Sequence, residues 1–136
     1  MSLAPLMHIL YLEDDADRRT VAQIALETVG GFVLRSCASG QEALEALEAL
    51  EAVAGGYRPD LMLLDVMMPG MDGPCTLAGL RQLQAAAHTP VMFMTAKVQS
   101  TEVSYYQSRG ALGVPAEPFD PMQLAQQVRS LWECRT

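Results

Sequence analysis

Residues 61–73 read LMLLDVMMPGMDG. The apolar run 61–64 ends directly at Asp65, and the Pro69-Gly70 and Asp72-Gly73 pairs that follow are typical of a shaped loop. A short apolar run bounded by turn residues indicates a buried strand of a parallel sheet. Asp65 is therefore predicted to lie at the carboxyl end of a strand, the edge where open α/β sheets bind their ligands.

Two other apolar runs end in the same way. The run 9–12 is followed by Glu13, Asp14 and Asp15, and the run 91–94 is followed by Thr95. Because parallel strands end on one edge of their sheet, these side chains are predicted to meet Asp65 there.

Helical patterns alternate with the apolar runs along the chain. Further strands are expected at 32–34 and 112–114. Helices are expected over 16–29, from the capping pair Ser39 and Glu42 to the glycines at 55–56, over 74–87, over 100–109, and after Asp120. This order predicts an α/β fold, a doubly wound five-stranded parallel sheet of (βα)5 type.

The composition excludes several classes of protein. Half of the 136 residues are hydrophobic, 18% are charged, and the net charge is −7, with Lys97 the only lysine. Such a chain is not expected to be disordered, nor to bind nucleic acid or an anionic membrane directly. The cysteines lack metal-ligand spacing, and no signal peptide or membrane span is visible. We expect a cytoplasmic protein with reduced thiols.

The clustered acids predict a divalent cation. Carboxylates held together repel one another unless they are protonated or bridged by a cation, and Mg²⁺ prefers oxygen ligands. Beside that ion, Asp65 is a candidate phosphoryl acceptor. Thr95 is placed to donate a hydrogen bond to a phosphoryl oxygen, and the backbone carbonyl of Met67 is placed to complete the metal shell.

The chain strongly resembles the receiver domain of bacterial two-component response regulators, from about residue 8 to residue 132. The likeness is carried by ILYLEDD (9–15), LDVMMPGMDG (64–73), MTAK (94–97), Gly110-Ala111 and EPF (117–119). The resemblance implies a flavodoxin-like topology for residues 8–133. It leaves 1–7 as an extension or cloning remnant and 134–136 as a tail, with no output domain.

The resemblance also implies roles for the clustered residues. A histidine kinase or phosphotransfer protein would pass a phosphoryl group to Asp65, giving 4-aspartylphosphate in a Mg²⁺-dependent reaction that the receiver assists without being an enzyme. Asp14 would bind the metal directly, Glu13 through water, and Met67 through its carbonyl. Thr95 would act as the switch. A downstream protein would bind helix four, strand five and helix five, where residues 104–106 fall.

Two positions depart from the family pattern. Glu117 stands where the family has a lysine that pairs with the phosphoryl oxygens, and a carboxylate there repels that group. Val114 stands where the family usually has an aromatic ring that reports phosphorylation. Lys97 is considered as a compensating cation, and a cis Glu117–Pro118 bond is expected from the family.

These departures leave an alternative open. The chain could be a degenerate receiver, a protein-interaction module that works without phosphorylation. An aspartyl-phosphate hydrolase is disfavoured because Met67 stands where a second acid would be needed. A flavin protein is disfavoured because the acids would repel the cofactor phosphate.

Overall fold

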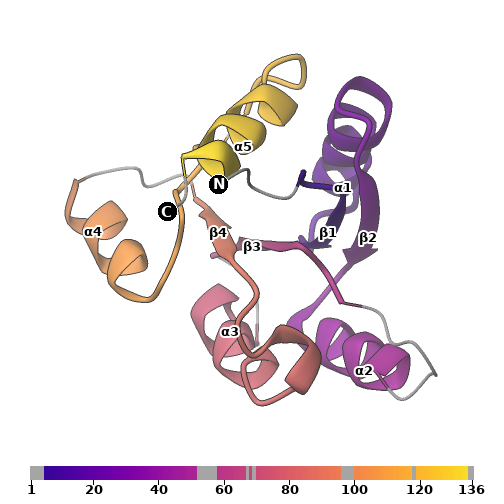
Figure 1. Cartoon of the computed structure of the whole chain (residues 1–136), viewed down its shortest axis with the longest axis vertical. Helices are drawn as coiled ribbons and strands as arrows, with labels where there is room; N and C mark the ends of the chain where they lie inside the picture. The colour runs from indigo at the N-terminus through magenta and orange to yellow at the C-terminus, as the bar shows by residue number, and fades with distance from the viewer. Residues whose placement is uncertain are drawn as a thin grey trace.

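The centre of the molecule is a parallel sheet with strand order β2-β1-β3-β4 (Figure 1). A computed structural model describes residues 5–51, 58–66, 68, 70–95, 100–117 and 119–134. The strands are β1 (His8–Leu12), β2 (Val33–Cys37), β3 (Leu61–Asp65) and β4 (Val91–Met94). The predicted fold class, a doubly wound parallel α/β sheet, is confirmed.

Helices cover both faces of this sheet. On one side lie α1 (Ala16–Gln23), its π-helical continuation η1 (Ile24–Val29) and α5 (Leu124–Glu133) (Figure 1). On the other lie α2 (Gly40–Glu51) and α3 (Gly73–Leu80), while α4 (Ser100–Ser108) stands beyond β4. Successive strand residues alternate between two cores, as the pleat of a strand requires. The α1 and α5 side buries Ile9, Tyr11, Leu61, Leu63, Met92 and Met94, and the other side buries Leu10, Leu12, Met62, Leu64, Val91 and Phe93.

The predicted fifth strand at 112–114 is not formed as a continuous strand. The segment 111–117 runs beside β4 and touches it in parallel bridges at Val91↔Ala111 and Thr95↔Ala116. Between these bridges β4 advances by four residues and its neighbour by five, so one residue bulges out of the ladder. Pro115 within this segment also lacks an N–H to donate. The segment still lies at the predicted edge of the sheet.

Several helix boundaries differ from the sequence prediction. The helix predicted over 16–29 continues as π-helix, with the N–H of Gly30 donating to the carbonyl of Ala25 at 3.1 Å. The helix predicted over 74–87 ends at Leu80, and a 3-10 turn, η2 (Gln84–Ala86), follows. Arg81 stabilises this ending because its Nη1 donates to the carbonyls of residues 86 and 89.

Of the helix caps predicted from the sequence, one is confirmed and one differs. Ser39 accepts from the N–H of Glu42, so the predicted N-cap is confirmed, while the Glu42 carboxylate accepts from the N–H of Ala38, one residue before the cap. Asp120 accepts from the N–H of Met122 but starts a turn, and α5 itself begins at Leu124. The predicted end of the second helix at 55–56 lies outside the described residues.

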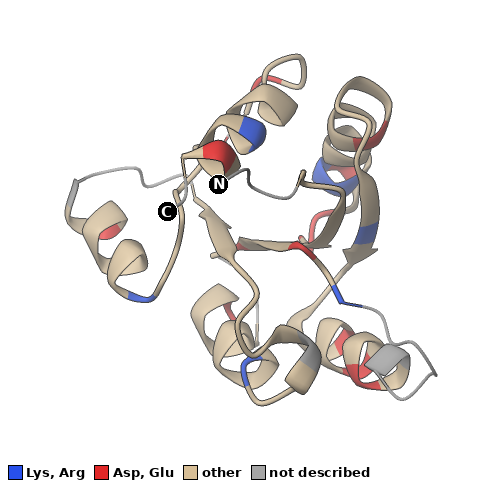
Figure 2. Cartoon of the chain, in the orientation of Figure 1, with Lys and Arg blue, Asp and Glu red and all other residues tan. Residues whose placement is uncertain are grey.

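Other features agree with the composition. Cys37 is buried, Cys75 and Cys134 are exposed, and all are free thiols. Burial and the charge of Glu42 raise the pKa of Cys37 to about 11, so its thiol stays neutral. Basic residues of the described chain are spread over several elements, and Arg18 and Arg19 are adjacent on α1 (Figure 2). Within the described residues, no helix has the length and apolar character needed to cross a membrane.

Candidate functional site

The predicted acids meet at the carboxyl edge of the sheet. Glu13 and Asp14 directly follow β1, and Asp65 is the last residue of β3. One carboxylate oxygen of each lies within 4.8 Å of the others. The neighbouring strands β1 and β3 thus bring together residues that are far apart in the sequence.

Burial sets the electrostatics of this cluster. Glu13 is 1% exposed and Asp65 is 2% exposed, whereas Asp14 faces solvent. Burial raises the pKa of Glu13, and a hydrogen bond with Asp65 and the charge of that residue raise it further. Two buried carboxyls so close together are stable only if they share a proton or receive a cation.

The arrangement fits a divalent cation. The Oε1 of Glu13 is buried and accepts no hydrogen bond from the described residues, although it lies 3.3 Å from the Nη1 of Arg18. An oxygen in that state has free lone pairs for a metal or a water on a metal. Met67, the predicted carbonyl ligand, lies outside the described residues.

Thr95 lies at the same edge. It follows Met94, the residue of β4 that pairs with Asp65, and it is 2% exposed. Its N–H donates to the carbonyl of Pro115 at 3.2 Å, and its own carbonyl accepts from the N–H of Glu117 at 2.9 Å. The backbone therefore fixes Thr95 beside the position at which the family lysine is expected.

Glu117 points into the cluster and does not turn away from it. Its Oε2 lies 2.6 Å from the Nη1 of Arg18. Burial raises the pKa of Glu117, the charge of Asp65 raises it further, and Arg18 opposes this rise. The unfavourable carboxylate predicted from the sequence is thus present, but it is paired.

Arg18 is the site residue that the sequence reasoning missed. The signal was available, since Arg18 lies in the first turn of the helix that Asp15 caps, and that helix begins beside the acids. The family pattern instead points to a lysine, and Lys97, the only lysine in the sequence, lies outside the described residues. The family-based expectation of a cis bond before Pro118 lies outside them too.

The burial of Val114 and of residues 104–106 on α4 bears on the predicted interaction face. Val114 is partly buried against the core on the α2 and α3 side. Tyr106 is 8% exposed, and its ring centroid lies 5.2 Å from that of Phe93. Tyr105 is 46% exposed, and Ser104 is exposed as well. The predicted interaction face therefore offers one exposed ring and one buried ring.

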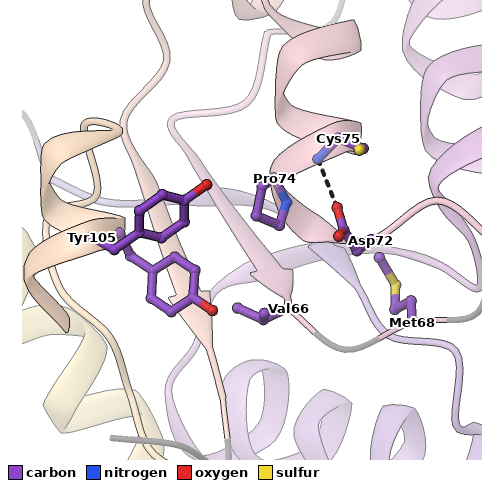
Figure 3. Close-up of a pocket in the computed structure, with 7 residues that line it drawn as sticks. Val66, Met68, Asp72, Pro74, Cys75 and Tyr105 are labelled. Carbon is purple, nitrogen blue, oxygen red and sulfur yellow. Dashed lines mark hydrogen bonds between the residues drawn. The ribbon is translucent and has the colours of Figure 1, made fainter. Parts of the chain in front are cut away.

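A cavity of about 700 Å³ separates the loop after Asp65 from α4 (Figure 3). Asp72 caps α3 at its floor, where the Oδ1 accepts from the N–H of Cys75 at 2.9 Å. The cavity is lined by Val66, Met68, Asp72, Pro74, Cys75, Tyr105 and Tyr106. The loop that follows the acid cluster is therefore not packed tightly against α4.

Gly73 packs closely against the backbone of Asp65. A Cβ at position 73 would lie 2.5 Å from the carbonyl oxygen of Asp65, closer than real contacts allow. We expect Gly73→Ala to lower the free energy of unfolding by about 1 to 3 kcal/mol, because the backbone must shift to admit the methyl group. Urea unfolding measures this loss.

Gly79→Ala is the matched control for this prediction. A Cβ there would meet only the end of the flexible Leu44 side chain, at 3.0 Å. The added methyl group also favours the helix, so we expect a change near zero or a gain. Equal losses in the two variants would contradict the close approach at Gly73.

The sequence of this chain is similar to those of known proteins. The sequence profile of the response regulator receiver domain matches residues 9–129. The transcriptional regulatory protein CseB of Streptomyces coelicolor is 33% identical over 129 residues, covering 95% of this chain and 50% of that protein. The DNA-binding response regulator MtrA of Mycobacterium tuberculosis is 34% identical, covering 90% and 49%. The chain spans about half the length of these relatives.

Solved structures give the same fold. The chemotaxis protein CheY4 of Vibrio cholerae superposes with a TM-score of 0.78 at 23% identity, covering 93% of this chain and 98% of that one. The receiver domain of the Francisella response regulator 1452 has a TM-score of 0.69 at 25% identity, covering 91% and 94%. On its profile match and these relatives, the chain belongs to the family of response regulator receiver domains.

Proposed function

We propose that this chain is a phospho-acceptor of two-component signalling and that Asp65 takes the phosphoryl group. The observation that carries the proposal is the position of Asp65, buried at the end of β3 with Glu13 and Asp14 within 4.8 Å. A carboxylate oxygen of Asp65 attacks phosphorus, the bond from phosphorus to the donor's oxygen or nitrogen breaks, and the donor leaves with that electron pair.

The metal that suits this reaction is Mg²⁺. Glu13, Asp14 and Asp65 would hold it, directly or through water, and the carbonyl of Met67 is proposed as a further ligand. When bound, Mg²⁺ neutralises the carboxylates and the oxygens of the incoming phosphoryl group. The end of β3 would hold the Asp65 carboxylate at the sheet edge, where the phosphoryl group enters.

Thr95 is the proposed switch. Its hydroxyl would donate to a phosphoryl oxygen, and a shift of Thr95 would be passed to residues 115–117 through the backbone hydrogen bonds that join them. A histidine kinase or phosphotransfer protein is the proposed donor, in the cytoplasm. The proposed output is a changed affinity for a protein that binds α4, the segment 111–117 and α5. On α4 the exposed Tyr105 has the guanidinium of Arg109 5.2 Å from its ring centroid.

Glu117 favours a second candidate. A carboxylate in place of the family lysine repels a phosphoryl group, so a receiver that works by protein binding alone remains the alternative.

Incubation with Mg²⁺ and acetyl phosphate or phosphoramidate, followed by intact mass measurement, separates the two candidates. We expect the mass of one phosphoryl group to be added to the native chain and not to Asp65→Asn. An unlabelled native chain, under conditions that label an ordinary receiver, would support the binding module.

A further inference from the structure

The side chain of Arg18 lies over the acid cluster and contacts both Glu13 and Glu117. Its Nη1 lies 2.6 Å from the Oε2 of Glu117 and 3.3 Å from the Oε1 of Glu13. The two carboxylates are 8% and 2% exposed, whereas the Arg18 side chain is 52% exposed. The guanidinium therefore sits at the mouth of a buried cluster, between the sheet edge and solvent.

The charge of Asp65 also reaches this guanidinium. Burial by itself lowers the pKa of Arg18, but the nearby carboxylates raise it overall, and Asp65 is one of them together with Glu13 and Glu117. Arg18 also contacts Glu13, and a carboxylate oxygen of Glu13 lies within 4.8 Å of one of Asp65, so the cation is close to the proposed acceptor. A phosphoryl group would add negative charge at that point.

The geometry of the guanidinium leaves donors available. Among the described residues, both contacts of Arg18 run through Nη1, so the N–H groups on Nη2 and Nε remain for another acceptor. A guanidinium presents its donors as a planar fork that matches the oxygens of a phosphoryl group. Glu117 accepts from Nη1, and this contact fixes the plane in which the N–H groups on Nη2 and Nε also lie.

We propose that Arg18 is the phosphoryl-binding cation of this receiver and that Glu117 is the residue that positions it. The proposal rests on phosphorylation of Asp65. It differs from the family arrangement, in which the lysine at the position of Glu117 makes this contact itself. The cation comes from α1, and the carboxylate that replaces the lysine acts as its anchor.

The test compares variants that move or remove the cation. Phosphorylation by acetyl phosphate with Mg²⁺ is followed by intact mass for the native chain, Arg18→Ala, Arg18→Lys, and the double variant Arg18→Ala with Glu117→Lys. Hydrogen bonds between charged groups are strong enough that Arg18→Ala should slow labelling roughly tenfold to a hundredfold. The double variant should recover the native rate or exceed it, and Arg18→Lys should recover part of it.

Matched controls separate Arg18 from other cations. Arg35→Ala makes the same change in net charge on the exposed face of β2, and its labelling should match that of the native chain. Lys97→Ala tests the other candidate cation, and its labelling should be unchanged as well. A loss in Lys97→Ala with none in Arg18→Ala would overturn the proposal.

A second readout excludes a merely structural role. Removing a positive charge beside the metal ligands should tighten Mg²⁺ binding to Arg18→Ala by about twofold to tenfold at low salt, measured by titration calorimetry. A residue that only supported the fold would weaken both Mg²⁺ binding and labelling when removed. That result, or native labelling in Arg18→Ala, would overturn the role of Arg18. Absence of labelling in the native chain and in every variant, including the double variant that carries Glu117→Lys, would instead overturn phosphorylation itself, and the proposal with it.

Discussion

The Asp65→Asn variant is expected to accept no phosphoryl group and yet to be more stable than the native chain in buffer without Mg²⁺. Asn lacks the nucleophilic carboxylate, so the added mass must disappear. Asn also removes one negative charge from a cluster in which Glu13 and Asp65 are almost completely buried. Its amide can donate to the Glu13 carboxylate, so the contact between the two side chains no longer requires a shared proton.

The expected gain in the stability of Asp65→Asn is modest. Relieving strain of this kind at a functional site typically stabilises a protein by on the order of 1 kcal/mol, which for a chain of this length raises the melting temperature by roughly 3 to 6 °C. Thermal unfolding in the presence of a chelator measures it. Added Mg²⁺ should raise the melting temperature of the native chain and have little effect on Asp65→Asn, because only the native site binds the ion well.

Asp72→Asn is the control. It makes the same substitution at the far end of the loop that follows Asp65, but Asp72 is the N-cap of α3, and Asn is an equally good cap. We expect its melting temperature without Mg²⁺ to stay near that of the native chain. If Asp65→Asn is no more stable than this control, the buried carboxylates do not strain the folded state.

The Glu117→Lys variant is expected to be phosphorylated faster than the native chain. The native Glu117 repels an incoming phosphoryl group, and its ion pair with Arg18 neutralises part of the cation that would attract it. Lysine there leaves both positive charges facing the phosphoryl group. One donor aimed at developing charge typically contributes about a hundredfold to a thousandfold in rate, and we expect a smaller increase, about tenfold to a hundredfold, because Arg18 already supplies a cation.

Glu117→Gln separates charge from hydrogen bonding in this prediction. The glutamine amide oxygen can still accept from Arg18, but the repulsive charge is gone, so we expect a rate between those of the native chain and of Glu117→Lys. The rate of acetyl phosphate labelling by intact mass gives the order. A lysine variant slower than the native chain would show that the carboxylate is needed for more than anchoring Arg18.

Much of the fold could be predicted because its causes are local. Short apolar runs ending in acids or threonine identified β1, β3 and β4, and β4 has the predicted bounds. The helix ends were less predictable, since the π-helical continuation of α1 and the early end of α3 depend on contacts made after folding. The bulge opposite β4 has the same origin, because the register between two segments is a tertiary property.

The acid cluster was determined by the sequence alone. Glu13, Asp14, Asp65 and Thr95 each follow a buried run, and a parallel sheet must bring such positions to one edge. What only the tertiary structure decided was the partner of Glu117. Arg18 is separated from it by 99 positions and belongs to an element of different type, so no spacing rule links the two. An ion pair depends on where side chains end in space, and only the packing of α1 against the sheet edge brought this cation to that carboxylate.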